Sequence, residues 1–129
     1  EELGLKDFFH QMPQTDTMAG ALKGVDLVAM PSRWEACGLL AMEALSAGTP
    51  IVGSSCIGLR EVLDGTPAKQ VPVGDALILA DALVNEIDNL DQRKQEFRLY
   101  QATAVERFAI DRPASALADL YVQLQKQAR

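Results

Sequence analysis

The sequence has little cysteine and no clustered positive charge, and each shortage excludes a class of protein. Only two of its 129 residues are cysteines, Cys37 and Cys56, and they form no metal-ligand set with the single histidine, His10. Neither a disulfide-rich scaffold nor a cysteine-ligated metal site is therefore expected. Lys and Arg total 12 against 18 Asp and Glu, giving a net charge of −6, and they form no runs. Nucleic acid and anionic membrane surfaces are therefore not expected partners.

Long apolar runs and an export signal are also absent from the printed sequence. No stretch approaches the roughly 20 apolar residues that a membrane-spanning helix needs. The first residues, EELGLKDFF, are acidic and lack the basic start of a signal peptide. We therefore expect a cytoplasmic protein that does not cross a membrane. What is present is ordinary for a globular domain: 48% hydrophobic and 23% charged residues in a length of about one domain.

Short apolar runs alternate with helix-forming segments along the chain. Strands are predicted for 25–30, buried on both faces, for 50–55, and for 69–73, which Pro72 confines to an edge. Helices are predicted for 38–47, 59–64, 76–90 with Asp75 as its cap, 91–108 and 113–127. This order indicates an α/β fold, a Rossmann-like parallel sheet flanked by helices. Its ligand site is expected at the carboxyl ends of the strands, in loops 31–38, 53–58 and 72–75.

Two glutamates, Glu35 and Glu43, flank the predicted start of the helix 38–47. The first N–H groups of a helix are unpaired and favour an anion such as phosphate, and Gly38 leaves room for its approach. Glu43 lies about 7 Å further along the axis, which is comparable to the separation of a diphosphate from its ribose. Its carboxylate could accept two hydrogen bonds from a ribose diol. The site would then bind a sugar, a diphosphate and a ribose in order; the alternative is a pair of solvated surface charges.

The stretch PSRWEACGLLAMEALSAGTPIVGSSCIGLREV, residues 31–62, closely resembles the signature of the group 1 glycosyltransferases, which are two-domain (GT-B) enzymes. The shared motif positions are Pro31, Ser32, Glu35, Gly38, Leu39, Glu43, Ala44, Ala47, Gly48, Pro50, Ile51, Val52, Gly58, Leu59 and Glu61. Weaker matches extend over almost the whole chain. The resemblance implies the carboxyl-terminal, nucleotide-sugar-binding domain of a family-4-like enzyme.

The resemblance also implies a role for each matching residue. Glu35 is the expected catalytic residue, which positions the hydroxyl groups of the donor sugar and is not a nucleophile. The expected donor-binding residues are Cys37 and Gly38 at the sugar and phosphate, Leu39 and Leu40 through their amides on the β-phosphate, Glu43 on the ribose, and Gly58 in a loop facing the donor. Apart from the nucleotide-sugar substrate, no cofactor is implied, and no acidic cluster suggests a metal.

Compared with the family pattern, residues 1–129 match only the second half of a donor domain. The first half, which carries an Arg and a Lys on the diphosphate, and the whole amino-terminal acceptor domain are not among them. The strand that contains LVAM would therefore expose an unpaired edge through which the chain could self-associate. We expect a partial domain that is inactive alone and needs an acceptor domain as its partner.

The resulting prediction is the donor-binding part of a retaining glycosyltransferase of the hexosyltransferase type. It would transfer a sugar from a nucleoside-diphosphate sugar to a saccharide, lipid or small-molecule acceptor. Two alternatives remain open. One is a non-catalytic fragment or assembly subunit that retains the fold, and the other is a domain like a nucleotide-sugar epimerase, although no catalytic acids of an epimerase are recognisable.

Overall fold

Three short parallel strands form the sheet of this protein. The computed structural model describes residues 3–127. The strands are β1 (Val28–Met30), β2 (Ile51–Ser54) and β3 (Lys69–Val71), in the spatial order β1-β2-β3. Both pairings are parallel, with Ala29 opposite Val52 and Gly53 opposite Gln70. The predicted α/β fold with a parallel sheet is confirmed.

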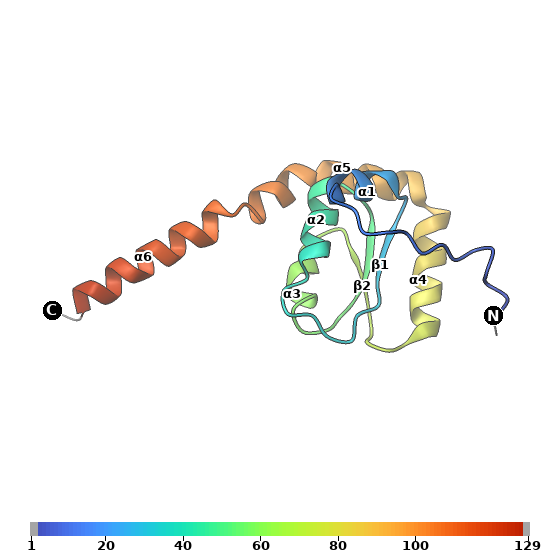
Figure 1. The fold of residues 1–129 in the computed structure, drawn as a ribbon, viewed down its shortest axis with the longest axis horizontal. Helices are drawn as coiled ribbons and strands as arrows, with labels where there is room; N and C mark the ends of the chain where they lie inside the picture. The colour runs from blue at the N-terminus through green and yellow to red at the C-terminus, as the bar shows by residue number, and fades with distance from the viewer. Residues whose placement is uncertain (1–2, 128–129) are drawn as a thin grey trace.

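Helices lie on both faces of the sheet and across one of its ends (Figure 1). They are α1 (Met18–Gly24), α2 (Leu39–Ala47), α3 (Arg60–Leu63), α4 (Ala76–Asp88), α5 (Leu90–Arg107) and α6 (Asp111–Gln127). Helices α2 and α3 cover one face and α4 the other, while α1 and α5 cross the end at which the strands begin. The carboxyl ends of the strands are therefore at the opposite end of the sheet. Helix α6 projects away from this body.

Local chemistry explains where several of these elements begin and end. The Asp75 carboxylate accepts a hydrogen bond of 3.0 Å from the amide of Ile78, which confirms the predicted cap of α4. Gly48 ends α2 in the left-handed conformation, with φ of 75°. Strand β3 lies at an edge of the sheet and ends directly before Pro72, as predicted, because proline cannot donate to a ladder.

Apolar side chains pack on each face of the sheet. Ile51 and Val52 are neighbours on β2 and enter different clusters, because successive side chains of a strand point to opposite faces. The cluster of Ile51 contains Leu45 of α2 and Phe97 of α5, and all three side chains are fully buried. The cluster of Val52 includes Ala82 of α4. The sheet is therefore fixed between its two helical layers.

In the first third of the chain, the structure adds a helix and corrects one expectation. Helix α1 was not predicted; tertiary contacts hold it, since Leu22 is buried and its carbonyl accepts a 2.8 Å hydrogen bond from the Thr49 hydroxyl. Strand β1 is not buried on both faces, because Ala29 is exposed and Val28 only half-buried. Within residues 3–127, β1 pairs with β2 alone, so its outer edge is free. In the same described region, no helix combines the length and apolar character that crossing a membrane requires.

Candidate functional site

The loops that follow the three strands meet at the carboxyl end of the sheet, as the sequence predicts. A cavity of about 170 Å³ opens there. Its lining includes Arg33 from the loop after β1, Ser54 at the end of β2, and Asp75 from the loop after β3. The carboxyl ends of all three strands, with the loops after them, thus contribute to one concave surface, which lies beside the start of α4 because Ala76 and Leu79 complete its lining. Glu35 and the residues at the start of α2 do not line this cavity.

Glu35 lies in the loop between β1 and α2 and is held there by hydrogen bonds to its side chain and to its backbone. The Ser32 hydroxyl donates to Oε1 of Glu35 over 2.7 Å. The Ser54 hydroxyl in turn donates to the carbonyl oxygen of Ser32, and the Ser54 side chain is only 1% exposed. The amide of Glu35 donates to the carbonyl of Ile57 over 3.3 Å. Glu35 as a whole is half-buried.

Two glycines allow the loop of Glu35 to lie directly on the loop after β2. Gly58 has φ of 81°, and a Cβ atom there would lie 2.1 Å from the carbonyl oxygen of Glu35. Gly38 has φ of 63°, and its Cβ would lie 3.2 Å from the carbonyl oxygen of Gly58. A side chain at Gly58 would overlap backbone atoms that have no room to move aside. Gly58 therefore allows its loop to pack directly against the backbone of Glu35.

The start of α2 presents backbone donors, as the sequence predicts. The Gly38 carbonyl accepts from the amides of Ala41, at 3.0 Å, and of Met42, at 3.3 Å. The amides of Leu39 and Leu40, two residues earlier, have no acceptor among residues 3–127, and Gly38 provides no side-chain cap. Such a helix start favours an anion. Cys37, directly before it, is exposed with a free thiol.

Glu43 lies on a different side of α2. It is exposed and lines a groove of about 260 Å³ between α1 and α2, together with Met18, Lys23 and Ala47. Five residues after Gly38, a helical position is rotated by roughly 140° at 3.6 residues per turn. Glu35, Cys37, Gly38, Leu39 and Leu40 thus gather around the start of the helix, whereas Glu43 faces α1.

The site contains features that the sequence did not indicate. Ser54 was seen only as the end of a strand, although a hydroxyl residue directly after a buried apolar run was a usable signal. Arg33 also lines the cavity, although it is not a position of the family motif. Across the described part of the chain, no group of three or more His, Cys, Asp and Glu side chains could hold a metal ion.

Sequence comparisons connect the chain with enzymes of sugar transfer. The family model "Glycosyl transferases group 1" matches residues 1–89. The D-inositol 3-phosphate glycosyltransferase of Xylanimonas cellulosilytica is 33% identical over 98% of this chain and 31% of its own length. The phosphatidyl-myo-inositol mannosyltransferase of Mycobacterium leprae is 34% identical over 92% of the chain and 32% of its own length. The chain thus spans about a third of these relatives.

Structural comparison gives the same result for the fold. The crystal structure of Anabaena HepE in complex with UDP superposes with a TM-score of 0.86 at 22% identity, over 95% of this chain and 34% of HepE. The HepE complex with UDP and glucose gives a TM-score of 0.84 at 23% identity. Both structures are of HepE, a longer chain that contains the arrangement described above. The chain belongs to the group 1 glycosyltransferases, as its motif predicts.

Proposed function

We propose that this chain forms the donor-binding part of a retaining glycosyltransferase, a hexosyltransferase that uses a nucleoside-diphosphate sugar. The observation that carries the proposal is the combination of free amides at Leu39 and Leu40 with a hydrogen-bonded carboxylate at Glu35. The names of the relatives support sugar transfer. UDP in the two HepE complexes supports a nucleotide ligand for this fold.

The site chemistry suits a leaving diphosphate. As the bond to the sugar breaks, negative charge grows on the diphosphate, and preorganised amides at a helix start stabilise that charge. In this proposal Leu39 and Leu40 donate to the β-phosphate, beside the close approach that Gly38 permits. Glu35 accepts hydrogen bonds from the sugar hydroxyls. Cys37 contributes its backbone at the sugar, and Gly58 fixes the loop that faces the donor.

Glu43 is assigned to the ribose. Its exposed carboxylate lies in the groove between α1 and α2, beside Lys23. A ribose diol in this groove would donate both hydroxyl protons to one carboxylate. The nucleotide would then extend from the start of α2 along the side that faces α1, with the sugar at Glu35.

Transfer itself needs more than these residues provide. We infer that acceptor binding belongs to an amino-terminal domain. The chain spans about a third of the length of relatives that are named as glycosyltransferase and mannosyltransferase. The chain alone is expected to bind donor without turnover. The free outer edge of β1 is a place for a further strand. At high concentration of the isolated chain, we expect a second copy to fill it, which sedimentation equilibrium would detect as a dimer.

A binding experiment tests the proposal. Saturation-transfer NMR with UDP, GDP and ADP, each free and as its glucose conjugate, should show contact with ribose protons for at least one nucleotide. Glu43→Gln should weaken that nucleotide about tenfold, because hydrogen bonds to a charged acceptor contribute about 1.5 kcal/mol or more. Glu106→Gln, an exposed glutamate on α5, is the matched control and should change nothing.

Two outcomes would overturn the donor-site assignment. If the parent chain binds none of the nucleotides, a non-catalytic remnant or assembly subunit that keeps the fold explains the motif better. If it binds a nucleotide with the same affinity in Glu43→Gln, the ribose lies elsewhere. Release of an epimerised sugar from any of the conjugates would instead point to epimerase chemistry.

A further inference from the structure

Two serines, Ser32 in the loop after β1 and Ser54 at the end of β2, connect Glu35 to the central strand of the sheet. We propose that Ser32 and Ser54 are positioning residues that orient the Glu35 carboxylate and thereby make the site select the sugar-bearing nucleotide over the free one. Ser54 donates to the Ser32 carbonyl, and the Ser32 hydroxyl donates to Oε1 of Glu35 over 2.7 Å. The role in selection rests on the proposed function.

The chain of hydrogen bonds starts from a rigid position. Ser54 is the last residue of β2, it pairs with Val71 of β3, and its side chain is 1% exposed. A serine hydroxyl carries one proton, and here that proton is used on the Ser32 carbonyl. The loop after β1 is therefore attached to the middle of the sheet at Ser32, three residues before Glu35. This attachment fixes the origin of the second hydrogen bond.

The backbone of Glu35 is fixed independently of the serines. The Glu35 amide donates to the Ile57 carbonyl over 3.3 Å, and Gly58 lies against the Glu35 carbonyl group. Backbone support alone leaves the side-chain torsions of a glutamate free, and that freedom is lost when a ligand binds. The hydrogen bond from Ser32 removes much of it beforehand. The carboxylate is thus preorganised before any sugar arrives.

The arrangement has a consequence for recognition. An ionised carboxylate only accepts hydrogen bonds, and one of its oxygens already receives the Ser32 proton. The other oxygen of the half-buried Glu35 remains for a ligand and accepts only from a donor such as a sugar hydroxyl. The terminal phosphate of a free nucleoside diphosphate is mostly deprotonated at neutral pH, because its second pKa is about 6, so it is a poor donor to the carboxylate. The two serines should therefore affect the sugar conjugate and leave the free nucleotide alone.

The binding test compares paired ligands in paired variants. Dissociation constants are measured for UDP and UDP-glucose, and for the corresponding GDP and ADP pairs, with the parent, Ser32→Ala and Ser54→Ala. Both variants should bind the sugar conjugate about fivefold more weakly, the value of one modest hydrogen bond. The free nucleotide should change less than about twofold. Ser32→Thr and Ser54→Thr, which keep the hydroxyl, should restore selection. Equal weakening of both ligands would show a merely structural role and overturn the proposal.

A second readout needs no ligand, so it separates failure of this proposal from failure of the proposed function. The carboxyl ¹³C resonance of Glu35 should shift in Ser32→Ala and in Ser54→Ala, and return in the threonine variants. Ser55→Ala is the matched control, because the half-buried Ser55 hydroxyl has no protein partner within residues 3–127. A resonance unchanged in Ser32→Ala would overturn the positioning role. A shifted resonance in a chain that binds no nucleotide would keep that role and reject the donor site. Should Ser54→Ala unfold, the half-buried Ser32 still decides the question through its own variants.

Discussion

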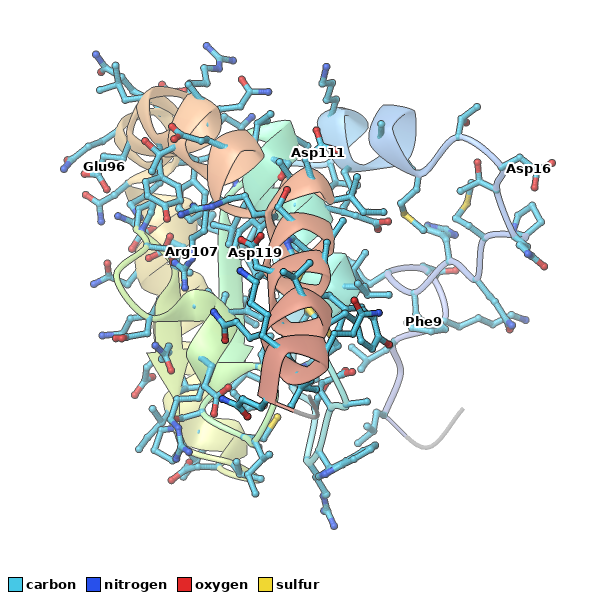
Figure 2. All side chains as sticks on the ribbon, turned by 90° about the vertical axis from the view of Figure 1, so that its left-hand side faces the viewer. Phe9, Asp16, Glu96, Arg107, Asp111 and Asp119 are labelled. Carbon is cyan, nitrogen blue, oxygen red and sulfur yellow. The ribbon has the colours of Figure 1, made fainter. Side chains whose placement is uncertain are left out.

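Helices α5 and α6 follow each other in the chain, have similar lengths of 18 and 17 residues, and differ completely in burial. Helix α5 crosses the body, and its Phe97 and Ala104 are fully buried. Helix α6 projects away, and none of its residues is buried (Figure 1). From the side, Asp111 and Asp119 follow the axis of α6, while Glu96 and Arg107 lie back on α5 against the body (Figure 2).

The burial is the reverse of what apolar patterning suggests. Helix α6 carries an apolar stripe at helical spacing, and each of its side chains is about half exposed: Leu117, Leu120, Tyr121 and Leu124. Helix α5 is richer in charge and yet places Phe97 in the main core. A periodic pattern predicts that a helix has an apolar face, but it does not specify what covers that face. For α5, burial is decided by packing of Phe97 in one cluster with Leu45 of α2 and Ile51 of β2.

The burial of a charged residue on α5 is also decided by tertiary contacts. A charged residue on a helix is usually exposed, but the Arg93 side chain of α5 is only 17% exposed. Its Nε donates to Glu86 of α4 over 2.7 Å, and its guanidinium also donates to the Pro67 carbonyl. The same guanidinium lies 5.4 Å from the centre of the Phe97 ring. Arg93 thus joins α4, α5 and the segment before β3.

The largest effect is expected at Phe97. Phe97→Ala should lower the free energy of unfolding by about 4 kcal/mol, because it leaves a cavity in the main cluster. Urea unfolding followed by circular dichroism measures this change. Leu99→Ala is the control on the same helix, since Leu99 is 77% exposed and its loss should cost less than about 0.5 kcal/mol. Similar values for the two variants would mean that α5 does not pack as described.

Removing the Arg93 charge should have the next largest effect. Arg93→Met keeps much of the stem and leaves Glu86 buried without its partner, which should cost about 3 kcal/mol. Arg98→Met, an exposed position on the same helix, should change stability by less than about 0.5 kcal/mol. The comparison fails if the two methionine variants have equal urea midpoints.

Two glycines with similar φ angles allow the effect of a tertiary contact on stability to be distinguished from the effect of local backbone conformation. Gly58 has φ of 81° and Gly65 φ of 68°, but nothing lies within 4 Å of a Cβ at Gly65. Both alanine variants should lose about 1 kcal/mol through the left-handed conformation. Gly58→Ala should lose about 2 kcal/mol more, because its Cβ would overlap the Glu35 carbonyl. Equal losses in the two variants would show that the loops do not touch.

The smallest effect is expected on α6. Leu120→Ser should change the free energy of unfolding of the body by less than about 0.5 kcal/mol, since Leu120 is 48% exposed and outside both clusters. The same urea titration, run at two protein concentrations, measures it. A loss above about 1 kcal/mol would instead reveal a partner surface for α6 in solution.

The sequence predicted the sheet well where the signals are local. Strand 50–55 became β2 at Ile51–Ser54, and Asp75 caps α4 as expected, because an apolar run and a cap act over a few residues. Helix α1 escaped prediction, since its seven residues include two glycines and its stability comes from Leu22 and Thr49. Local propensity has no information about a partner 27 residues away.

The candidate site shows the same division. Glu35, Cys37, Gly38, Leu39 and Leu40 are nearly consecutive, so their gathering at a helix start follows from the motif itself. The role of Glu43 at the ribose stays a prediction. Its helical position places it in the groove beside α1, away from the other residues of the candidate site. The support beneath Glu35 could not be predicted. Its members come from the loop after β1, the end of β2 and the loop after β2, and they meet only when β1 and β2 pair: Ser32, Ser54, Ile57 and Gly58.

By itself, the sequence determined the order of strands and helices from β1 onward, the parallel sheet and the family to which the chain belongs. These follow from apolar periodicity, caps and a long motif, which are properties of neighbouring residues. Only the tertiary structure decided that Phe97 and Arg93 are buried while α6 is not, and that Ser54 supports Glu35. Those outcomes depend on contacts between residues far apart in the chain, and the energy of such a contact exists only once the sheet and its helices have come together.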